Sequence, residues 1–347
     1  MSTDPVSAES VEATRTSRAS VIGRGRHVFL LGTVITLLAW WVPNYFGARW
    51  LSTWTSTLVF AMAAAGIGLL YSRLGLASLT QVALIGVGGW VALRLEFAFH
   101  LPFPIVVLAS GTITALIGLA ISLPTLRLSG LYLALVTLMM AAGFHEIFIA
   151  AGFPNGGSGF LGYQSSGDLE RMSRPSIATT DPAYFRLVLI VAVACFLLVW
   201  LHDSTKPGRA WRLIAQSEGA AHATGINVTF YKTWAFTLAA FLAGIGGAMF
   251  AGQLGQLGPS SFQTIDSLLL FGLVLVGGAY HWSGWIIGVI IFKAFPALLD
   301  DLGLNGNIAT MIAGLALILN LIAAPRGIVG EVGRLIAANR KSSESDQ

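Results

Sequence analysis

Long apolar runs, separated by short polar segments, dominate this chain. Ten of them approach the roughly 17–25 residues that an α-helix needs to cross a bilayer. We place them at 28–46, 52–71, 76–97, 101–123, 130–151, 184–202, 233–252, 267–280, 285–300 and 307–324. The two runs between 267 and 300 are short for a full crossing, so we expect them to be broken or tilted. The pattern predicts an all-α, polytopic membrane protein with about ten transmembrane helices.

The composition excludes an ordinary soluble protein. Only 10% of the residues are charged and 55% are hydrophobic, whereas a soluble domain has about 25% charged residues. The net charge of +4 does not indicate nucleic-acid binding, because the basic residues are scattered between the runs. A single cysteine, Cys195, excludes an internal disulfide. We interpret its thiol as a small hydrophobe in an apolar run.

The distribution of Lys and Arg predicts the topology. With the N-terminus inside, most basic residues fall in cytoplasmic segments, as the positive-inside rule requires. Both termini and the polar loop 203–232 are then cytoplasmic, and the loop 152–183 is external. We predict a disordered cytoplasmic tail at 1–27, a transmembrane domain at 28–326 and a cytoplasmic tail at 327–347. No small-residue cleavage site follows an apolar core, so we predict no removable signal peptide.

The basic segment Lys206–Lys232 interrupts two apolar runs and contains a predicted short helix, Arg209–Ala223. Gly225 follows, where a left-handed helix stop is favoured. Helical spacing places six residues on one face: Trp211, Ile214, Ala215, Glu218, Ala221 and His222. The loop therefore carries an amphipathic helix.

Two interpretations of this helix stay open. In one, it lies on the inner membrane surface, with Arg209 and Arg212 facing lipid phosphates and Trp211 in the interface. In the other, it docks a soluble partner, which approaches closely over the small residues Gly219, Ala220, Ala221 and Ala223. The arginines lie near the helix N-terminus, where the dipole disfavours positive charge, so helix stability does not explain them.

Polar and ionisable residues inside the runs are few. Ser78, Thr80 and Gln81 lie among glycines, which favours either close helix packing or a broken helix along a translocation path. Lys293 is charged near the middle of a run. It either faces a cavity, a partner or an acid such as Asp300, seven residues on, or it extends to the membrane surface.

Motifs for chemistry are missing from the sequence. His145–Glu146 begins HEIFI, which lacks the second His of a zinc protease helix. The phosphate-binding pattern GxxxxGK[ST] does not occur either, so we predict no catalytic residue, no metal and no nucleotide site in this chain.

Four stretches resemble one family. The sequence GRAWRLIAQSEGAAHATGINVTFYKTWAFTLAAFLAGIGGAMFA is similar to the cytoplasmic coupling loop and following helix of LivM-type permeases of branched-chain amino-acid ABC importers. The matching positions are Gly208–Arg209, Glu218 with Ala220 and Ala221, Gly225–Ile226, and Lys232 before Ala235–Phe236. LRLSGLYLALVTL carries Gly130, Tyr132, Ala134 and Thr137 in family positions, and NGGSGF and APRGI match two further motifs. The chain departs at Thr80 and Gln81, where Gly and His are usual, and at 279–282.

The resemblance implies one half of a heterodimeric pore in the bacterial inner membrane. The expected partners are a LivH-type permease, two ABC ATPase subunits that hold ATP and Mg, and a periplasmic or lipid-anchored solute-binding protein. The chain itself would hold no cofactor. Leucine, isoleucine and valine are the first expectation for the solute, and urea, short amides or other amino acids the alternative, which the departures leave open.

The resemblance, the polar residues of the third run and the position of the external loop together give three sets of candidate residues. The ATPase-coupling set is Arg209, Arg212, Glu218, Ala220, Ala221 and Gly225. The translocation-path set is Ser78, Gln81, Tyr132 and Thr137, and the external-loop set is Asn155, Gly156 and Gly157. The external loop is either a flexible connector or part of the seat of the binding protein.

Two other classes of function remain as alternatives. An ion-coupled secondary transporter needs intramembrane carboxylates, and Glu146 is almost the only candidate well inside a run. A membrane enzyme needs a cluster of catalytic groups, whereas Asp300–Asp301 is a single pair at the end of a run. Neither alternative explains the coupling-loop pattern.

Overall fold

A computed structural model describes residues 38, 40–125, 128, 130–155, 171–303, 308, 311–312, 314–315 and 327–329. The chain divides into two compact units, residues 1–51 and 52–347. In the described part of the first unit, an aromatic cluster brings the rings of Trp41 and Tyr45 to 5.2 Å and those of Phe46 and Trp50 to 6.2 Å.

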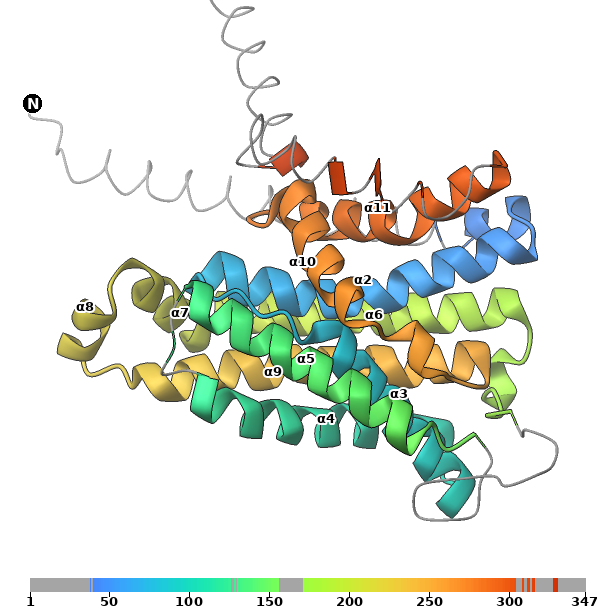
Figure 1. Ribbon diagram of the computed structural model, residues 1–347, viewed down its shortest axis with the longest axis horizontal. Helices are drawn as coiled ribbons and strands as arrows, with labels where there is room; N and C mark the ends of the chain where they lie inside the picture. Colours follow the sequence, from blue (N-terminus) through green and yellow to red (C-terminus); the bar gives the residue numbers. More distant parts are fainter. Residues whose placement is uncertain are drawn as a thin grey trace, which may run out of the picture. The chain divides into compact units, whose positions relative to one another are not determined.

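The described residues form helices and no strand. The long helices are α2 (Ala48–Leu74), α3 (Gln81–Phe99), α4 (Phe103–Thr125), α5 (Leu131–Ala151), α6 (Asp181–Ser204), α9 (Val228–Leu254), α10 (Thr264–Gly278) and α11 (Trp282–Asp301). The short ones are η1 (Ser176–Ala178), α7 (Lys206–Gln216), α8 (Glu218–Ala223) and η2 (Pro259–Ser261). Figure 1 shows α2, α4, α6 and α9 running along roughly one direction, with α3 and α5 crossing them obliquely.

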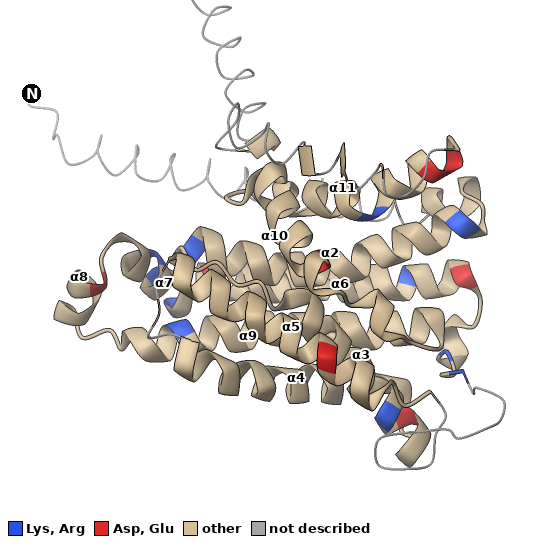
Figure 2. Ribbon diagram, viewed as in Figure 1, with Lys and Arg blue, Asp and Glu red and all other residues tan. Residues whose placement is uncertain are grey.

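Eight helices in the described residues are long and apolar enough to cross a membrane. They correspond to the eight central runs predicted from the sequence, and the all-helical class is confirmed. The predicted spans 28–46 and 307–324 lie mostly outside the described residues, as do the tails 1–27 and 327–347 apart from 327–329. Figure 2 shows Lys, Arg, Asp and Glu gathered at the two ends of the helices, with few between.

Helix α9 forms the centre of the packing, against α3 and α4. Glycines let the backbones approach closely: a Cβ on Gly88 would lie 2.4 Å from the Gly244 carbonyl oxygen, and one on Gly247 would lie 2.1 Å from that of Ile85. Since helices in lipid associate through such close van der Waals contact, the predicted packing role of the glycines in α3 is confirmed.

Helix α3 begins five residues later than predicted. Residues 75–80 are not helical, and Leu76, Ser78, Leu79 and Thr80 are buried. The backbone N–H of Leu79 donates to Thr137 Oγ1 on α5 at 3.0 Å. A side-chain oxygen thus replaces a helical partner for backbone that lies away from water. Residues 75–80 thus form the connection between α2 and α3, and α3 itself is a continuous helix.

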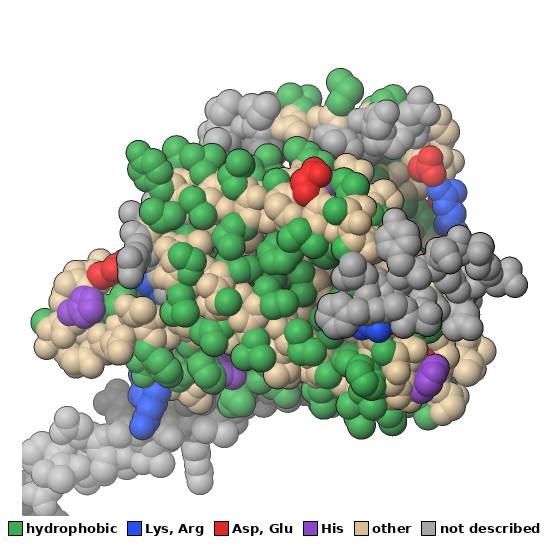
Figure 3. Space-filling view, turned by 60° about the horizontal axis from the view of Figure 1, so that its bottom comes forward, with side chains coloured by type: hydrophobic (Ala, Val, Ile, Leu, Met, Phe, Trp, Pro, Cys, Tyr) green, Lys and Arg blue, Asp and Glu red, His purple; other side chains and the backbone are tan. Residues whose placement is uncertain are grey.

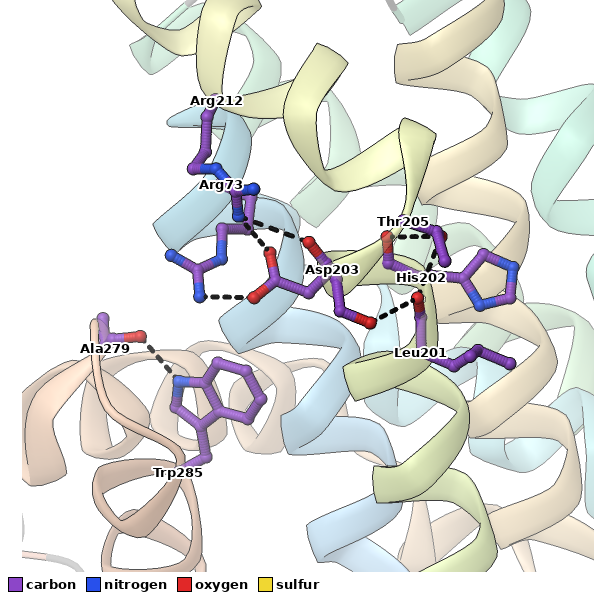
Figure 4. Close-up of polar contacts among 9 residues, drawn as sticks. Arg73, Leu201, His202, Asp203, Thr205, Arg212, Ala279 and Trp285 are labelled. Carbon is purple, nitrogen blue, oxygen red and sulfur yellow. Dashed lines mark hydrogen bonds and ion pairs between the residues drawn. The ribbon is translucent and has the colours of Figure 1, made fainter. Parts of the chain in front are cut away.

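Helices α10 and α11 pair as a hairpin, which corresponds to the two short runs. The indole of buried Trp285 donates to the carbonyl oxygen of Ala279 at 2.6 Å across the turn (Figure 4). Gly68 of α2 makes room for this ring, because a Cβ there would lie 2.0 Å from it. The departure from the family pattern at 279–282 thus forms a tight turn beside a buried tryptophan.

Candidate functional site at the α7–α8 end

The predicted helix Arg209–Ala223 is two helices. Helix α7 ends at Gln216, Ser217 is extended, and α8 begins at Glu218. The hydroxyl of Ser217 accepts from the backbone N–H of Ala220 at 3.2 Å, which is an N-cap. A single helix over this stretch is therefore wrong, because the cap at Ser217 starts a new helix direction.

The break changes which residues face the protein. Trp211, Ile214 and Ala221 are buried, whereas the other members of the predicted face, Ala215, Glu218 and His222, are exposed. The indole N–H of Trp211 donates to the Tyr231 carbonyl oxygen at 2.9 Å. Trp211 therefore fixes α7 to the first turn of α9 and does not lie in a membrane interface.

The turn from α6 into α7 needs a glycine at position 208. A Cβ there would lie 2.0 Å from the carbonyl oxygen of Asp203 and 2.4 Å from its carbonyl carbon. These are backbone atoms that cannot move aside without unwinding the end of α6. The Gly–Arg pair at the start of the loop thus has a steric reason: Gly208 lets α7 fold back against α6.

Asp203 joins three helices at this end. Its carboxylate accepts from Arg73 Nη2 on α2 at 2.8 Å and from Arg212 Nη1 on α7 at 3.0 Å (Figure 4). Arg212 also donates to the Asp203 carbonyl oxygen at 3.3 Å, although 46% of its side chain stays exposed. Arg212 is therefore an internal brace rather than a free cation for lipid phosphates.

A second ion pair holds α8. Lys232 Nζ, on α9, donates to Glu218 Oε1 at 2.5 Å. The lysine side chain is 8% exposed and the glutamate 57%, so the pair lies where the protein interior meets the surface. The two residues that the family pattern marks, Glu218 and Lys232, are brought together by the fold across 14 positions of sequence.

Gly225 ends α8 with a positive φ of 79°. The backbone N–H of Ile226 donates to the Ala221 carbonyl oxygen and that of Gly225 to the His222 carbonyl oxygen, both at 3.0 Å. This is the Schellman arrangement that favours glycine, and it confirms the predicted stop. Ala221, predicted as a contact residue, is instead buried on the inner side of α8.

What remains outward is a surface rich in small residues, which we name the α8 surface. Its members are Arg209, Gly219, Ala220, His222, Ala223 and Gly225, all exposed. A Cβ on Gly225 would meet nothing within 4 Å, and one on Gly219 only Ser217 Oγ at 3.8 Å. Helix α8 projects beyond the ends of the long helices (Figure 1). A close-fitting partner can therefore reach it.

The predicted path residues divide into a buried group, on the inner side of α5, and Tyr132, on its outward side. Ser78, Gln81 and Thr137 are buried; Ser78 Oγ lies 3.1 Å from Thr80 Oγ1, and Gln81 Oε1 lacks a hydrogen bond among the described residues. Tyr132 is instead 72% exposed, on the outward side of α5. The four residues thus do not form one cluster, although Thr137 contacts the extended segment.

Asn155 of the external-loop set has a structural role. Its Nδ2 donates to the Leu257 carbonyl oxygen at 2.8 Å, and its Oδ1 accepts from the Leu257 backbone N–H at 3.1 Å. The amide ties the end of α5 to the segment after α9. Gly156 and Gly157 lie outside the described residues.

Lys293 of α11 lies between aromatic rings. Its Nζ is 3.9 Å from the ring centroid of Phe60 and 4.8 Å from that of Phe292. Asp266 of α10 interacts electrostatically with Lys293 and with His145. The sequence did not indicate Asp266 as a neighbour, because α10 and α11 are brought together only by their hairpin.

Sequence reasoning also missed Asp203 and Arg73. Both lie at the ends of spans, on the same side of the membrane in the predicted topology. That common location could have indicated that the two residues interact. Among the described residues, no group of three His, Cys, Asp or Glu could hold a metal ion.

Comparisons with known proteins identify one family model and several import permeases as similar to this chain. The profile described as branched-chain amino acid transport system / permease component matches residues 50–321. The high-affinity branched-chain amino acid permease proteins LivM of Salmonella typhimurium and Escherichia coli are each 26% identical over 87% of this chain and 74% of their own length. The autoinducer 2 import permease LsrC of Yersinia pseudotuberculosis is 26% identical over 85% of this chain and 82% of its own length. No solved structure matches.

Proposed function

This chain belongs to the family of permease components of branched-chain amino acid transport systems, and on that premise we propose that it is a membrane subunit of an ATP-driven importer of amino acids. Leucine, isoleucine and valine are the proposed solutes, because the LivM proteins are named for branched-chain amino acids. The observation that carries the proposal is the exposed α8 surface, held rigidly to the long helices.

The proposed mechanism is mechanical coupling at the α8 surface. One of two separate ATPase subunits binds there, and the two subunits hold ATP and Mg. Their closure on ATP displaces α7 and α8, and the displacement reaches α2 and α6 through Asp203 and α9 through Trp211 and Lys232. Because α9 is packed tightly against α3 and α4, these helices move with it. Alternating access by such a rigid-body motion requires only that the two states contact the ATPases differently.

The remaining parts of the importer follow the same proposal. The α7–α8 end and both termini face the cytoplasm of a bacterium, and the chain lies in the inner membrane. A LivH-type permease forms the other half of the pore. A periplasmic or lipid-anchored binding protein delivers the solute, and the region around Asn155 lies on its side.

The connection between α2 and α3 lies within the proposed pore domain. Ser78, Gln81 and Thr137 are buried, and they would meet the solute only if the helices move apart. Tyr132 is exposed and would reach it without such a movement. Urea and short amides remain alternative solutes for the same architecture.

The test is purification of the chain from its native membrane in mild detergent, with and without an Ala220→Arg substitution. We expect the unmodified chain to recover a second permease and two ATPase subunits with magnesium-dependent ATP hydrolysis. Ala220→Arg should lower ATPase recovery and leave the second permease bound, because the change is confined to the α8 surface.

The matched control is Ser176→Arg, which is exposed in η1 before α6, at the opposite end of that helix from α7. It should recover the same subunits as the unmodified chain. Undiminished recovery of the ATPases with Ala220→Arg would contradict the proposed coupling surface. Uptake of a sugar, an amide or urea but not leucine by the purified complex would contradict the proposed solute alone.

A further inference from the structure

Glu146 of α5 differs from every other acidic residue in the eight described spans. Each of the others has an interaction partner: Ser173 for Glu96, Arg174 for Asp181, Arg73 and Arg212 for Asp203, Lys293 for Asp266, and further groups for Asp300 and Asp301. Glu146 makes no hydrogen bond or ion pair with the described residues, and its side chain is exposed. It is a single unbalanced carboxylate.

The position of Glu146 makes this exposure costly in lipid. It lies five residues before the end of α5 at Ala151, about 8 Å along the helix axis. An ionised side chain at such a depth nearly always faces protein or a water-filled cavity, because hydrocarbon cannot solvate it. The side of α5 that carries Glu146 is therefore covered by another chain or by water, rather than by lipid tails.

Glu146 shares this side with residues of helical spacing, which we name the α5 face. Its members are Tyr132, Met139, Gly143 and Glu146, at intervals of seven, four and three residues. Tyr132 and Met139 are each 72% exposed. A Cβ on Gly143 would meet nothing within 4 Å, so there is open space one turn from the carboxylate. Figure 3 shows an acidic patch among hydrophobic side chains, away from the charges at the two ends.

We propose that the α5 face lines the solute path and that the carboxylate of Glu146 binds the ammonium group of the transported amino acid. This inference rests on the proposed function. An aliphatic amino acid has one ammonium group and an apolar side chain, and the α5 face offers one carboxylate, an apolar surface at Met139 and space at Gly143. Asp266 is less suited to this role, because it already interacts electrostatically with Lys293.

The test is leucine uptake by the complete importer in proteoliposomes, with and without Glu146→Gln. The amide keeps the shape and removes the charge, so we expect a rise of about tenfold in the KM for uptake, with subunit recovery and thermal stability unchanged. Glu146→Asp, which keeps the charge, should restore most of the loss. Gly143→Val should lower uptake by filling the space, also without loss of stability.

Three outcomes would overturn the inference. Unchanged uptake with Glu146→Gln would show that the carboxylate does not meet the solute. Loss of the second permease on purification would show that Glu146 instead binds a cation of that subunit. If the unmodified complex takes up a sugar but no amino acid, the proposed solute fails and the inference fails with it. If the unmodified complex takes up leucine and Glu146→Gln takes it up equally well, the inference alone fails.

Discussion

The α7–α8 end and the α5 face are both outward surfaces with charged residues, but the charges are paired in the first and unpaired in the second among the described residues. At the α7–α8 end, Asp203, Arg73, Arg212, Glu218 and Lys232 are all paired with one another. The surface left for a partner is rich in small residues. On the α5 face, the carboxylate of Glu146 has no partner among the described residues and lies among apolar side chains.

The charges at the α7–α8 end stabilise the fold, whereas the carboxylate on the α5 face is available to a ligand outside the chain. A paired charge at the end of a span stabilises the junction of helices, and its removal leaves the other charge without a partner. An unpaired charge inside a span costs free energy and contributes no contact to the chain. Substitutions should therefore lower stability at the α7–α8 end and change only transport at the α5 face.

The largest effect on stability is expected for Asp203→Ala. Arg73 and Arg212 both lose their carboxylate, and removal of one member of a buried pair costs about 3–5 kcal/mol. Since Arg212 is half-exposed, we expect about 2 kcal/mol here. Thermal unfolding in detergent would measure it. The control is Arg209→Ala, an exposed residue without an ion pair among the described residues, which should leave the unfolding temperature unchanged. Equal stability of the two variants would break the comparison.

A smaller loss is expected for Trp211→Phe. The ring is buried and its N–H donates to the Tyr231 carbonyl oxygen, so phenylalanine keeps much of the packing and removes only that hydrogen bond. We expect a loss of about 1 kcal/mol and faster hydrogen exchange in α7. A variant that exchanges as slowly as the unmodified protein would show that packing alone holds α7 to α9.

Lys232→Met should cost less than 1 kcal/mol, roughly the value of an exposed ion pair. The methionine fills the buried stem position, and Glu218 turns to water because it is already 57% exposed. The substitution should instead affect the coupling between ATP hydrolysis and transport, because α8 loses its ion pair with α9. ATP hydrolysis should then respond less to the binding protein. Glu218→Gln is the matched variant and should weaken coupling in the same way, but it should lower stability more, because it leaves the Lys232 ammonium, only 8% exposed, without its carboxylate. A fall in stability for Lys232→Met as large as that of Asp203→Ala would contradict this ordering.

The smallest effect on stability is expected for Glu146→Gln, for which we predict no fall in the unfolding temperature. The side chain makes no contact that the amide would lose, and removal of an unbalanced charge relieves a cost. The same thermal unfolding measurement checks it beside Asp203→Ala. A clear destabilisation by Glu146→Gln would place the carboxylate among the braces and remove the contrast between the two surfaces.

Part of the candidate site was predictable because it depends on local chemistry. Gly225 ends a helix in the left-handed conformation that only glycine adopts readily, and its place after a helical pattern indicates this. The division into α7 and α8 was not predicted, because Ser217 reads as an ordinary polar residue until its hydroxyl caps Ala220. Of the predicted face, Glu218, Ala221 and His222 lie after that break, in α8.

By itself, the sequence determined that this chain is a helical membrane protein, where eight of its spans lie, and which family it resembles. These properties follow from apolar length, composition and local motifs, which are read along the chain. Only the tertiary structure decided that Asp203 joins three helices, that Lys293 lies beside Asp266, and that Glu146 faces outward without a partner. The first two are contacts between residues that are far apart in sequence. The third depends on which side of α5 meets its neighbours, and the apolar runs of the sequence do not indicate that side.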